Sequence, residues 1–189
     1  MVDAPHSAAQ PPLGGVAAPR ILPVVQGTFE ISRDQTVVLS TILGSCVAVC
    51  LFDLEIGVGG MNHFLLPSGG DGDTKNIKYG AHSMELLINR MFKSGARRGA
   101  LKAKVFGGAS MNANLRDIGG SNAAFAKGFL RDEGIPTMSE SLGGMQARRV
   151  HFHPVSGAAR MMMVPQHEAP VERIERVRAP AVKTDIELF

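Results

Sequence analysis

Apolar residues form two kinds of pattern along the middle of the chain. Short apolar or β-branched runs bounded by turn residues predict strands over 24–31, 37–39, 47–52, 58–66, 101–106, 148–153 and 159–164. Residues 81–94 instead repeat at helical spacing, which predicts a helix with Met84, Leu87, Ile88, Met91 and Phe92 on its apolar face. A second helix is predicted over 121–131, with Ser121 as its N-cap. Strands at both ends and two helices between them predict an α+β layered fold.

The two ends of the chain differ from this middle part. Residues 1–20 are rich in Ala, Pro and Gly and are predicted to be a disordered N-terminal tail, because they have too little apolar surface to bury. Residues 21–164 carry the strand and helix patterns and are predicted to be one domain. Residues 165–189 are charged and interrupted by proline, which predicts a C-terminal tail with a short helix over 171–178.

Composition excludes several classes of function. The net charge is +3 and the pI is about 9.1, but the basic residues are scattered without interleaved aromatic residues, so we expect no nucleic-acid binding. No apolar run approaches the roughly 20 residues of a membrane span, and no signal pattern opens the chain, so a cytoplasmic protein without membrane insertion is expected. Two cysteines argue for a reducing compartment and against a disulfide scaffold. No nucleotide-binding motif is present, and no cofactor is expected.

The segment 36–67 holds the candidate chemistry. Cys46 follows the turn at Gly44-Ser45, and His63 ends the next apolar run, seventeen residues later. A thiol is mostly protonated at neutral pH and needs a neighbouring base to become a nucleophile. A hairpin between the two runs would bring His63 back to the level of Cys46. The rival interpretation is that Cys46 is a core residue and His63 a structural histidine.

A metal site is the other chemistry that these residue types allow. Cys46, Cys50, His63 and His82 could contribute ligands, but the spacing of the two cysteines differs from the usual zinc knuckle. Cys50 lies inside an apolar run and is predicted to be core. His151 and His153 share one face of a predicted strand, without an evident third ligand, and are expected to be exposed. We therefore expect no metal.

Several ordered motifs resemble the CheD family of chemoreceptor glutamine deamidases. They are LGSCVAV over 43–49, GGMNHFLLP over 59–67, KYG over 78–80, MELLIN over 84–89, KVFGGA over 104–109, IG over 118–119, Asn122, GG over 143–144 and RRV over 148–150. The resemblance covers about residues 27–164.

The resemblance implies a specific activity and specific residues. The family hydrolyses side-chain amides of selected receptor glutamines to glutamate and ammonia, and is also described as hydrolysing receptor glutamyl methyl esters. Its nucleophilic cysteine matches Cys46 and its histidine matches His63. Its third catalytic position is a threonine six residues before the cysteine, which here is Ser40. The adjacent Thr41 also carries a hydroxyl able to orient the imidazole, and the alternation of side chains along a strand allows only one of them to do so.

The resemblance also implies a fold and partners. The family fold is a β core covered by helices, similar to the catalytic domain of cytotoxic necrotizing factor. The implied partners are methyl-accepting chemotaxis receptors as substrate and, in some systems, the phosphatase CheC. A non-enzymatic adaptor that binds receptor or CheC is the alternative function, and a thiol protease or transglutaminase is the enzymatic rival.

Overall fold

The computed structural model describes residues 18–66, 74–111 and 118–165. The short helix predicted over 171–178 and all but the last few residues of the predicted N-terminal tail lie outside this part. Arg20, the last residue of that predicted tail, belongs to the first strand and pairs with Val37. The described residues form nine strands, two α-helices and one 3-10 turn at Arg98–Ala100.

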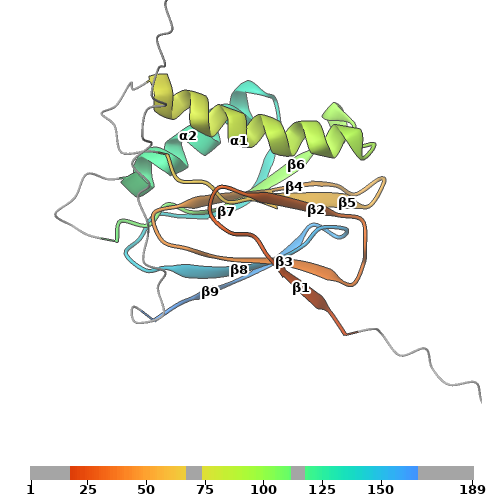
Figure 1. Ribbon diagram of the computed structural model, residues 1–189, viewed down its shortest axis with the longest axis horizontal. Coiled ribbons are helices and arrows are strands. Elements are labelled where there is room, and N and C mark those ends of the chain that lie inside the picture. Colours follow the sequence, from red (N-terminus) through yellow and green to blue (C-terminus); the bar gives the residue numbers. More distant parts are fainter. Residues whose placement is uncertain (1–17, 67–73, 112–117, 166–189) are drawn as a thin grey trace, which may run out of the picture.

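The elements form three layers, which Figure 1 shows edge-on. The four-stranded sheet has the order β1-β3-β8-β9 and consists of β1 (Arg20–Pro23), β3 (Val37–Leu43), β8 (Arg148–His153) and β9 (Ala158–Met163). The five-stranded sheet has the order β2-β5-β4-β6-β7 and consists of β2 (Phe29–Ser32), β5 (Val58–Asn62), β4 (Val47–Asp53), β6 (Lys102–Gly107) and β7 (Thr137–Leu142). Helices α1 (Thr74–Lys93) and α2 (Ile118–Asp132) cover its outer face. The predicted α+β layered architecture is therefore confirmed.

The N-terminal segment of the fold differs from the single strand predicted over 24–31. Two short strands form instead, and each joins a different sheet: β1 pairs with β3, and β2 pairs with β5. The break is a β-turn in which Thr28 N–H donates to Val25 O over 3.1 Å. Gly27 has a φ of 84°, the left-handed conformation that the third position of a type II turn needs.

Both helices begin earlier than the sequence predicted. Helix α1 starts at Thr74 instead of residue 81. Gly80 therefore lies inside the helix, where it packs closely: a Cβ there would lie 2.6 Å from the Phe125 ring. Helix α2 starts at Ile118, so Ser121 lies inside the helix and is not its N-cap. Strand β7 was not predicted, because its residues are polar and largely exposed, yet it pairs in parallel with β6.

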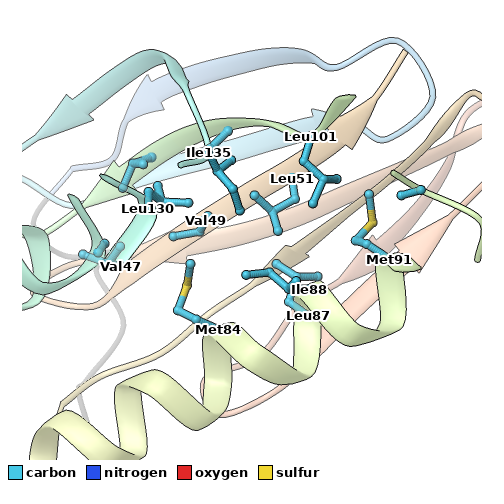
Figure 2. Close-up of a cluster of buried hydrophobic side chains, with 14 of the residues drawn as sticks. Val47, Val49, Leu51, Met84, Leu87, Ile88, Met91, Leu101, Leu130 and Ile135 are labelled. Atoms are coloured by element: carbon cyan, nitrogen blue, oxygen red, sulfur yellow. The ribbon is translucent and has the colours of Figure 1, made fainter. Parts of the chain in front are cut away.

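The core lies in the two spaces between the three layers. On the helix side, the predicted face of α1 is confirmed: Met84, Leu87 and Met91 are fully buried against the five-stranded sheet, as Figure 2 shows. Burying each such side chain contributes roughly 1.5–3 kcal/mol relative to exposure. The second cluster fills the space between the sheets and contains both Cys46 and Cys50. The candidate nucleophile therefore borders the layer between the sheets.

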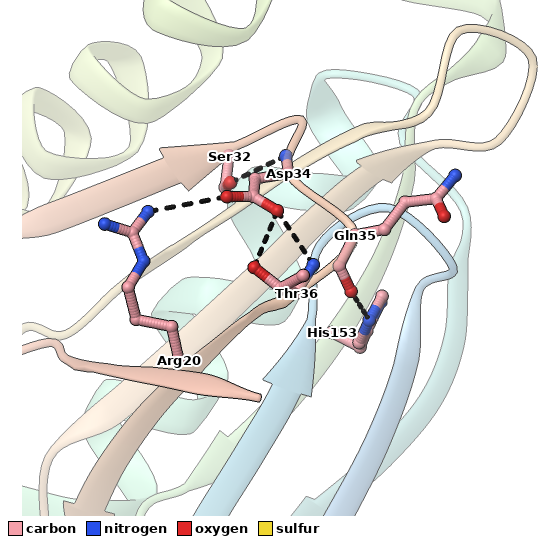
Figure 3. Close-up of polar contacts among 6 residues, drawn as sticks. All are labelled: Arg20, Ser32, Asp34, Gln35, Thr36 and His153. Atoms are coloured by element: carbon pink, nitrogen blue, oxygen red, sulfur yellow. Dashed lines mark hydrogen bonds and ion pairs between the residues drawn. The ribbon is translucent and has the colours of Figure 1, made fainter. Parts of the chain in front are cut away.

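A polar clamp fixes the loop before β3 (Figure 3). Asp34 accepts hydrogen bonds from the backbone and the hydroxyl of Thr36, both over 2.8 Å, and lies 3.6 Å from Arg20. The Thr36 backbone N–H and hydroxyl, helped by Arg20, lower the pKa of Asp34. His153 Nε2 donates to Gln35 O over 2.7 Å, so this histidine is half-buried and bonded, where the sequence predicted an exposed side chain. The clamp ties β1 and β8 to the start of β3.

Arg148 joins the two sheets at the other end of β8. Its side chain is fully buried, and its guanidinium donates to the carbonyl oxygens of Ser141 and Gly143 and to Ser141 Oγ. Burial lowers the pKa of Arg148. Arg149, the next residue, faces the opposite side of the strand and is half-buried.

Replacing Arg148 is expected to destabilise the fold. Arg148→Ala leaves two carbonyl groups without their donor, which should lower the free energy of unfolding by about 2–4 kcal/mol. Arg149→Ala is the matched control and should change it by less than about 1 kcal/mol. Urea unfolding measures both variants. Equal stability of the two variants would contradict the bridging role of Arg148.

Candidate active site

The β4–β5 hairpin brings Cys46 and His63 to the same level. One register runs from Asp53 opposite Val58 to Val47 opposite Phe64, and the last pair exchanges two hydrogen bonds of 2.9 Å. This register places His63 opposite Ala48 and Cys46 opposite Leu65. Cys46 and His63 are thus diagonal neighbours, which in antiparallel pairs have side chains within reach of one another.

Both side chains point into the layer between the sheets. Val47 and Phe64 belong to the cluster on the helix side, so their neighbours Cys46 and His63 face the other way. Cys46 belongs to the cluster between the sheets, and His63 contacts Thr41 of the four-stranded sheet. Two glycines of β5 pack closely elsewhere along the strand: a Cβ at Gly60 would lie 2.5 Å from Ile31, and one at Gly59 2.3 Å from Pro154 O.

The imidazole is held through one of its nitrogens. His63 Nδ1 lies 2.8 Å from Thr41 Oγ1 and 3.3 Å from Val24 O. A carbonyl can only accept a hydrogen bond, so these two neighbours favour the tautomer with the proton on Nδ1. In that tautomer Nε2 carries the lone pair that a general base needs.

The hydroxyl beside the imidazole belongs to Thr41 and not to Ser40, the residue that the sequence favoured. Side chains of β3 alternate, with Leu39, Thr41 and Leu43 buried toward the other sheet. Ser40 has the opposite orientation and pairs with His151 of β8. The threonine therefore lies five residues before Cys46, instead of the six that the resemblance implied.

Three hydrogen bonds fix the backbone of the turn that carries Cys46. Ala109 N–H donates to Gly44 O over 2.8 Å, Asn122 Nδ2 donates to Ser45 O over 2.9 Å, and Gly108 N–H donates to Cys46 O over 2.8 Å. Asn122 Oδ1 also accepts from Leu66 N over 2.8 Å and so links this turn to the segment after His63.

Gly107 permits this packing. It has a φ of 112°, and a Cβ there would lie 2.1 Å from Cys46 O. The bonds of Asn122 and Gly108 to the cysteine turn appear only in the fold.

The two cysteines differ in their surroundings. Cys50 is fully buried in β4, and burial raises its pKa far above the ordinary range despite the nearby Lys104. Cys50 is therefore a core residue, as predicted. Cys46 retains 3% exposure at the start of β4, and its Sγ lies 3.5 Å from Gln26 Oε1. Gln26 is an exposed residue, so the thiol contacts the side chain of a residue that reaches solvent.

The four residues considered above as metal ligands do not form a metal-binding group. His82 is exposed on α1, and no group of three or more His, Cys, Asp or Glu suited to a metal occurs among residues 18–66, 74–111 and 118–165. Within the same residues, neither helix is both long and apolar enough to cross a bilayer.

A pocket of about 340 Å³ lies next to the cysteine turn. Gly108, which bonds Cys46 O, forms part of its wall, together with the first turns of α2 and the glycine pair Gly143-Gly144. Lys127 and Glu140 line it and form an ion pair of 2.9 Å. The pocket therefore adjoins the backbone of the cysteine turn through Gly108, on the side of α2.

Two solved structures resemble this chain distantly. The YfiH protein of Bacillus licheniformis is 14% identical with a TM-score of 0.43, over 68% of this chain and 61% of that chain. Protein NMB0706 of Neisseria meningitidis is 13% identical with a TM-score of 0.43, over 76% of this chain and 73% of that chain. The predicted similarity to cytotoxic necrotizing factor stays a prediction.

Comparison of sequences is more specific. A family model described as CheD chemotactic sensory transduction matches residues 65–163. A Ruegeria sp. (strain TM1040) protein named probable chemoreceptor glutamine deamidase CheD 1 is 51% identical over 88% of this chain and 94% of its own length. A Caulobacter vibrioides (strain NA1000 / CB15N) protein named probable chemoreceptor glutamine deamidase CheD is 53% identical over 88% of this chain and 91% of its own length. The chain belongs to the CheD family.

Proposed function

We propose that this protein deamidates selected glutamine side chains of chemotaxis receptors, with Cys46 as nucleophile and His63 as base. The names of its relatives supply the reaction and the substrate class. The observation that carries the proposal is the arrangement of His63 and Cys46. Thr41 holds the imidazole of His63 through Nδ1, and the thiol of Cys46 is its diagonal neighbour just before β4. Thr41 takes the orienting role that the sequence had given to Ser40.

The first step forms a bond between sulfur and carbon. His63 Nε2 accepts the proton of the Cys46 thiol, and Sγ attacks the carboxamide carbon of the receptor glutamine. The carbonyl electron pair moves to oxygen and gives a tetrahedral oxyanion. Backbone N–H groups of the turn 44–46 are proposed to stabilise this charge, because that turn is held rigidly by Gly108, Ala109 and Asn122.

The second half of the reaction releases both products. The imidazolium of His63 gives its proton to the leaving nitrogen, so ammonia departs and a thioester remains on Cys46. His63 then takes a proton from water, whose oxygen attacks the thioester carbon. Collapse of this intermediate returns the proton to sulfur and frees a glutamate side chain. A glutamyl methyl ester can follow the same route, with methanol as the leaving group.

The product changes the receptor by one negative charge and creates a methylation site. The reaction is proposed to take place in the cytoplasm, and CheC is a proposed partner. The pocket beside the cysteine turn is the proposed contact for receptor residues that flank the glutamine, since it shares Gly108 with that turn.

Mass spectrometry of a co-expressed receptor tests the function. Each converted glutamine raises the receptor mass by about one dalton and should map to specific receptor peptides. A receptor expressed alone provides the control. A receptor that binds the protein without any mass change would favour the adaptor alternative. Peptide cleavage would favour a protease, and amine incorporation a transglutaminase.

The choice between Thr41 and Ser40 has its own test. Thr41→Val removes the hydroxyl beside Nδ1 at nearly constant volume and should lower kcat by about 3- to 10-fold. Thr41→Ser keeps the hydroxyl and should restore most of this loss, whereas a role in packing alone would not be restored. Ser40→Ala should leave kcat within about twofold, because Ser40 faces away from the site. A larger loss from Ser40→Ala than from Thr41→Val would reverse the assignment.

A further inference from the structure

We propose that the side chain of Gln26 covers the nucleophile Cys46. In this position it occupies the place of the substrate carboxamide, and it must rotate away before a receptor glutamine can enter. This inference rests on the proposed function, because it takes Cys46 as the nucleophile. The group that covers the thiol is chemically the same as the group that the enzyme is proposed to hydrolyse.

The contact is direct. Gln26 Oε1 lies 3.5 Å from Cys46 Sγ, a distance at which a thiol donates a weak hydrogen bond to a carbonyl oxygen. The carbon of that carboxamide is about 1.2 Å from its oxygen, so the whole group lies in the space from which a substrate amide would approach sulfur. Cys46 keeps 3% exposure and His63 keeps 6%, while Gln26 itself is exposed. A substrate amide therefore needs the space that the Gln26 side chain fills.

The backbone beneath Gln26 is anchored to the site on both sides. Val24 N–H donates to Ser40 O over 2.8 Å, and Gly27 N–H donates to His63 O over 2.7 Å. His63 N–H in turn donates to Thr28 O over 3.0 Å, and Val24 O lies beside His63 Nδ1. These bonds fix the turn, and Gly27 supplies the left-handed conformation that it needs. Displacement of the cover is therefore a rotation of one exposed side chain and needs no movement of the turn.

A cover of this kind competes with the substrate. When only a fraction of the molecules have the thiol uncovered, the apparent affinity for substrate falls by that fraction. A neutral hydrogen bond from a thiol is weak, so the cover should reduce access by about 3- to 10-fold and not block it. A receptor that binds through other surfaces supplies the free energy to displace Gln26, which favours the intended glutamine over free amides.

The test compares Gln26→Ala with Gln35→Ala. Gln35 is an exposed glutamine before β3, and Figure 3 shows its side chain pointing away from the polar clamp, so its removal is the matched control. The first readout is the second-order rate of alkylation of Cys46 by iodoacetamide, which needs no receptor. The second is the split between KM and kcat for receptor deamidation.

Gln26→Ala should speed alkylation of Cys46 and lower KM for the receptor, each by about 3- to 10-fold, with kcat unchanged and Gln35→Ala like wild type. Gln26→Glu should slow alkylation at neutral pH, because a carboxylate beside sulfur raises the pKa of the thiol.

An alkylation rate unaltered by Gln26→Ala overturns the proposal. So does a loss of kcat in that variant, which would make Gln26 a supporting group of catalysis. A Cys46-dependent mass increase at Gln26 in the purified protein also overturns it, because Gln26 would then be a substrate and not a lasting cover. Alkylation of Cys46 does not require deamidation. The alkylation rates therefore test the role of Gln26 even if the protein does not deamidate receptors.

Discussion

Replacement of Cys46 by alanine is expected to abolish deamidation of the receptor. The thiolate is the only proposed nucleophile, and removal of a nucleophile that works with a base commonly costs at least about 10³-fold in kcat. Ammonia release from a receptor fragment and the mass shift of the intact receptor measure the loss. Stability should change little, since Cys46 lies at the edge of the cluster between the sheets and alanine keeps its Cβ.

Cys50→Ala is the control for this prediction. Cys50 lies in the strand that follows Cys46 and faces the same cluster, but it is fully buried, and its raised pKa keeps the thiol protonated. The variant should keep most of the activity and lose about 1 kcal/mol of stability through lost packing. Activity in Cys46→Ala equal to that of wild type, or loss confined to Cys50→Ala, would refute the assignment of the nucleophile.

Replacement of His63 by glutamine is expected to lower kcat by about 10²- to 10⁴-fold, the usual contribution of a positioned general base. Glutamine is neutral and of similar size, and its amide can still donate to Thr41 and Val24, the two groups that now surround Nδ1. It cannot accept the thiol proton. The rate of alkylation of Cys46 at neutral pH should therefore fall together with kcat.

His82→Gln provides the same substitution at an exposed position of α1 and should leave both rates unchanged. Thermal unfolding of the two variants separates chemistry from folding, because His63 is buried and its replacement can also cost stability. A folded His63→Gln protein with unchanged kcat and unchanged alkylation would assign His63 a structural role only.

The arrangement of the cysteine turn and the pocket links the proposed deamidation to recognition of the receptor. The cysteine turn is held by Asn122 and by the backbone of Gly108 and Ala109. Gly108 also lines the neighbouring pocket, together with residues of α2, the helix that holds Asn122. Changes at α2 can thus alter both receptor contact and the position of the nucleophile. Lys127 and Glu140 in this pocket carry opposite charges and are the proposed contacts for charged receptor residues of either sign.

The sequence by itself determined the local parts of this protein. The runs at 37–39, 47–52 and 58–66 predicted strand β3, which holds Thr41, and strands β4 and β5, which Cys46 and His63 directly flank, because period-two and continuous apolar patterns report directly on burial. The hairpin at 53–57 fixed the level of His63 against Cys46, because the register of a hairpin follows from its turn. The spacing of Met84, Leu87 and Met91 predicted the buried face of α1 for the same local reason.

Only the tertiary structure decided which of two adjacent hydroxyls serves the imidazole. Ser40 and Thr41 point to opposite faces of β3, and which face is inward depends on the second sheet packing against it. The same holds for Gln26, Gly107 and Asn122, whose contacts with the cysteine turn join segments far apart in the chain. Such contacts leave no periodic signal in the sequence, because they arise from the meeting of layers and not from the pattern of any one element.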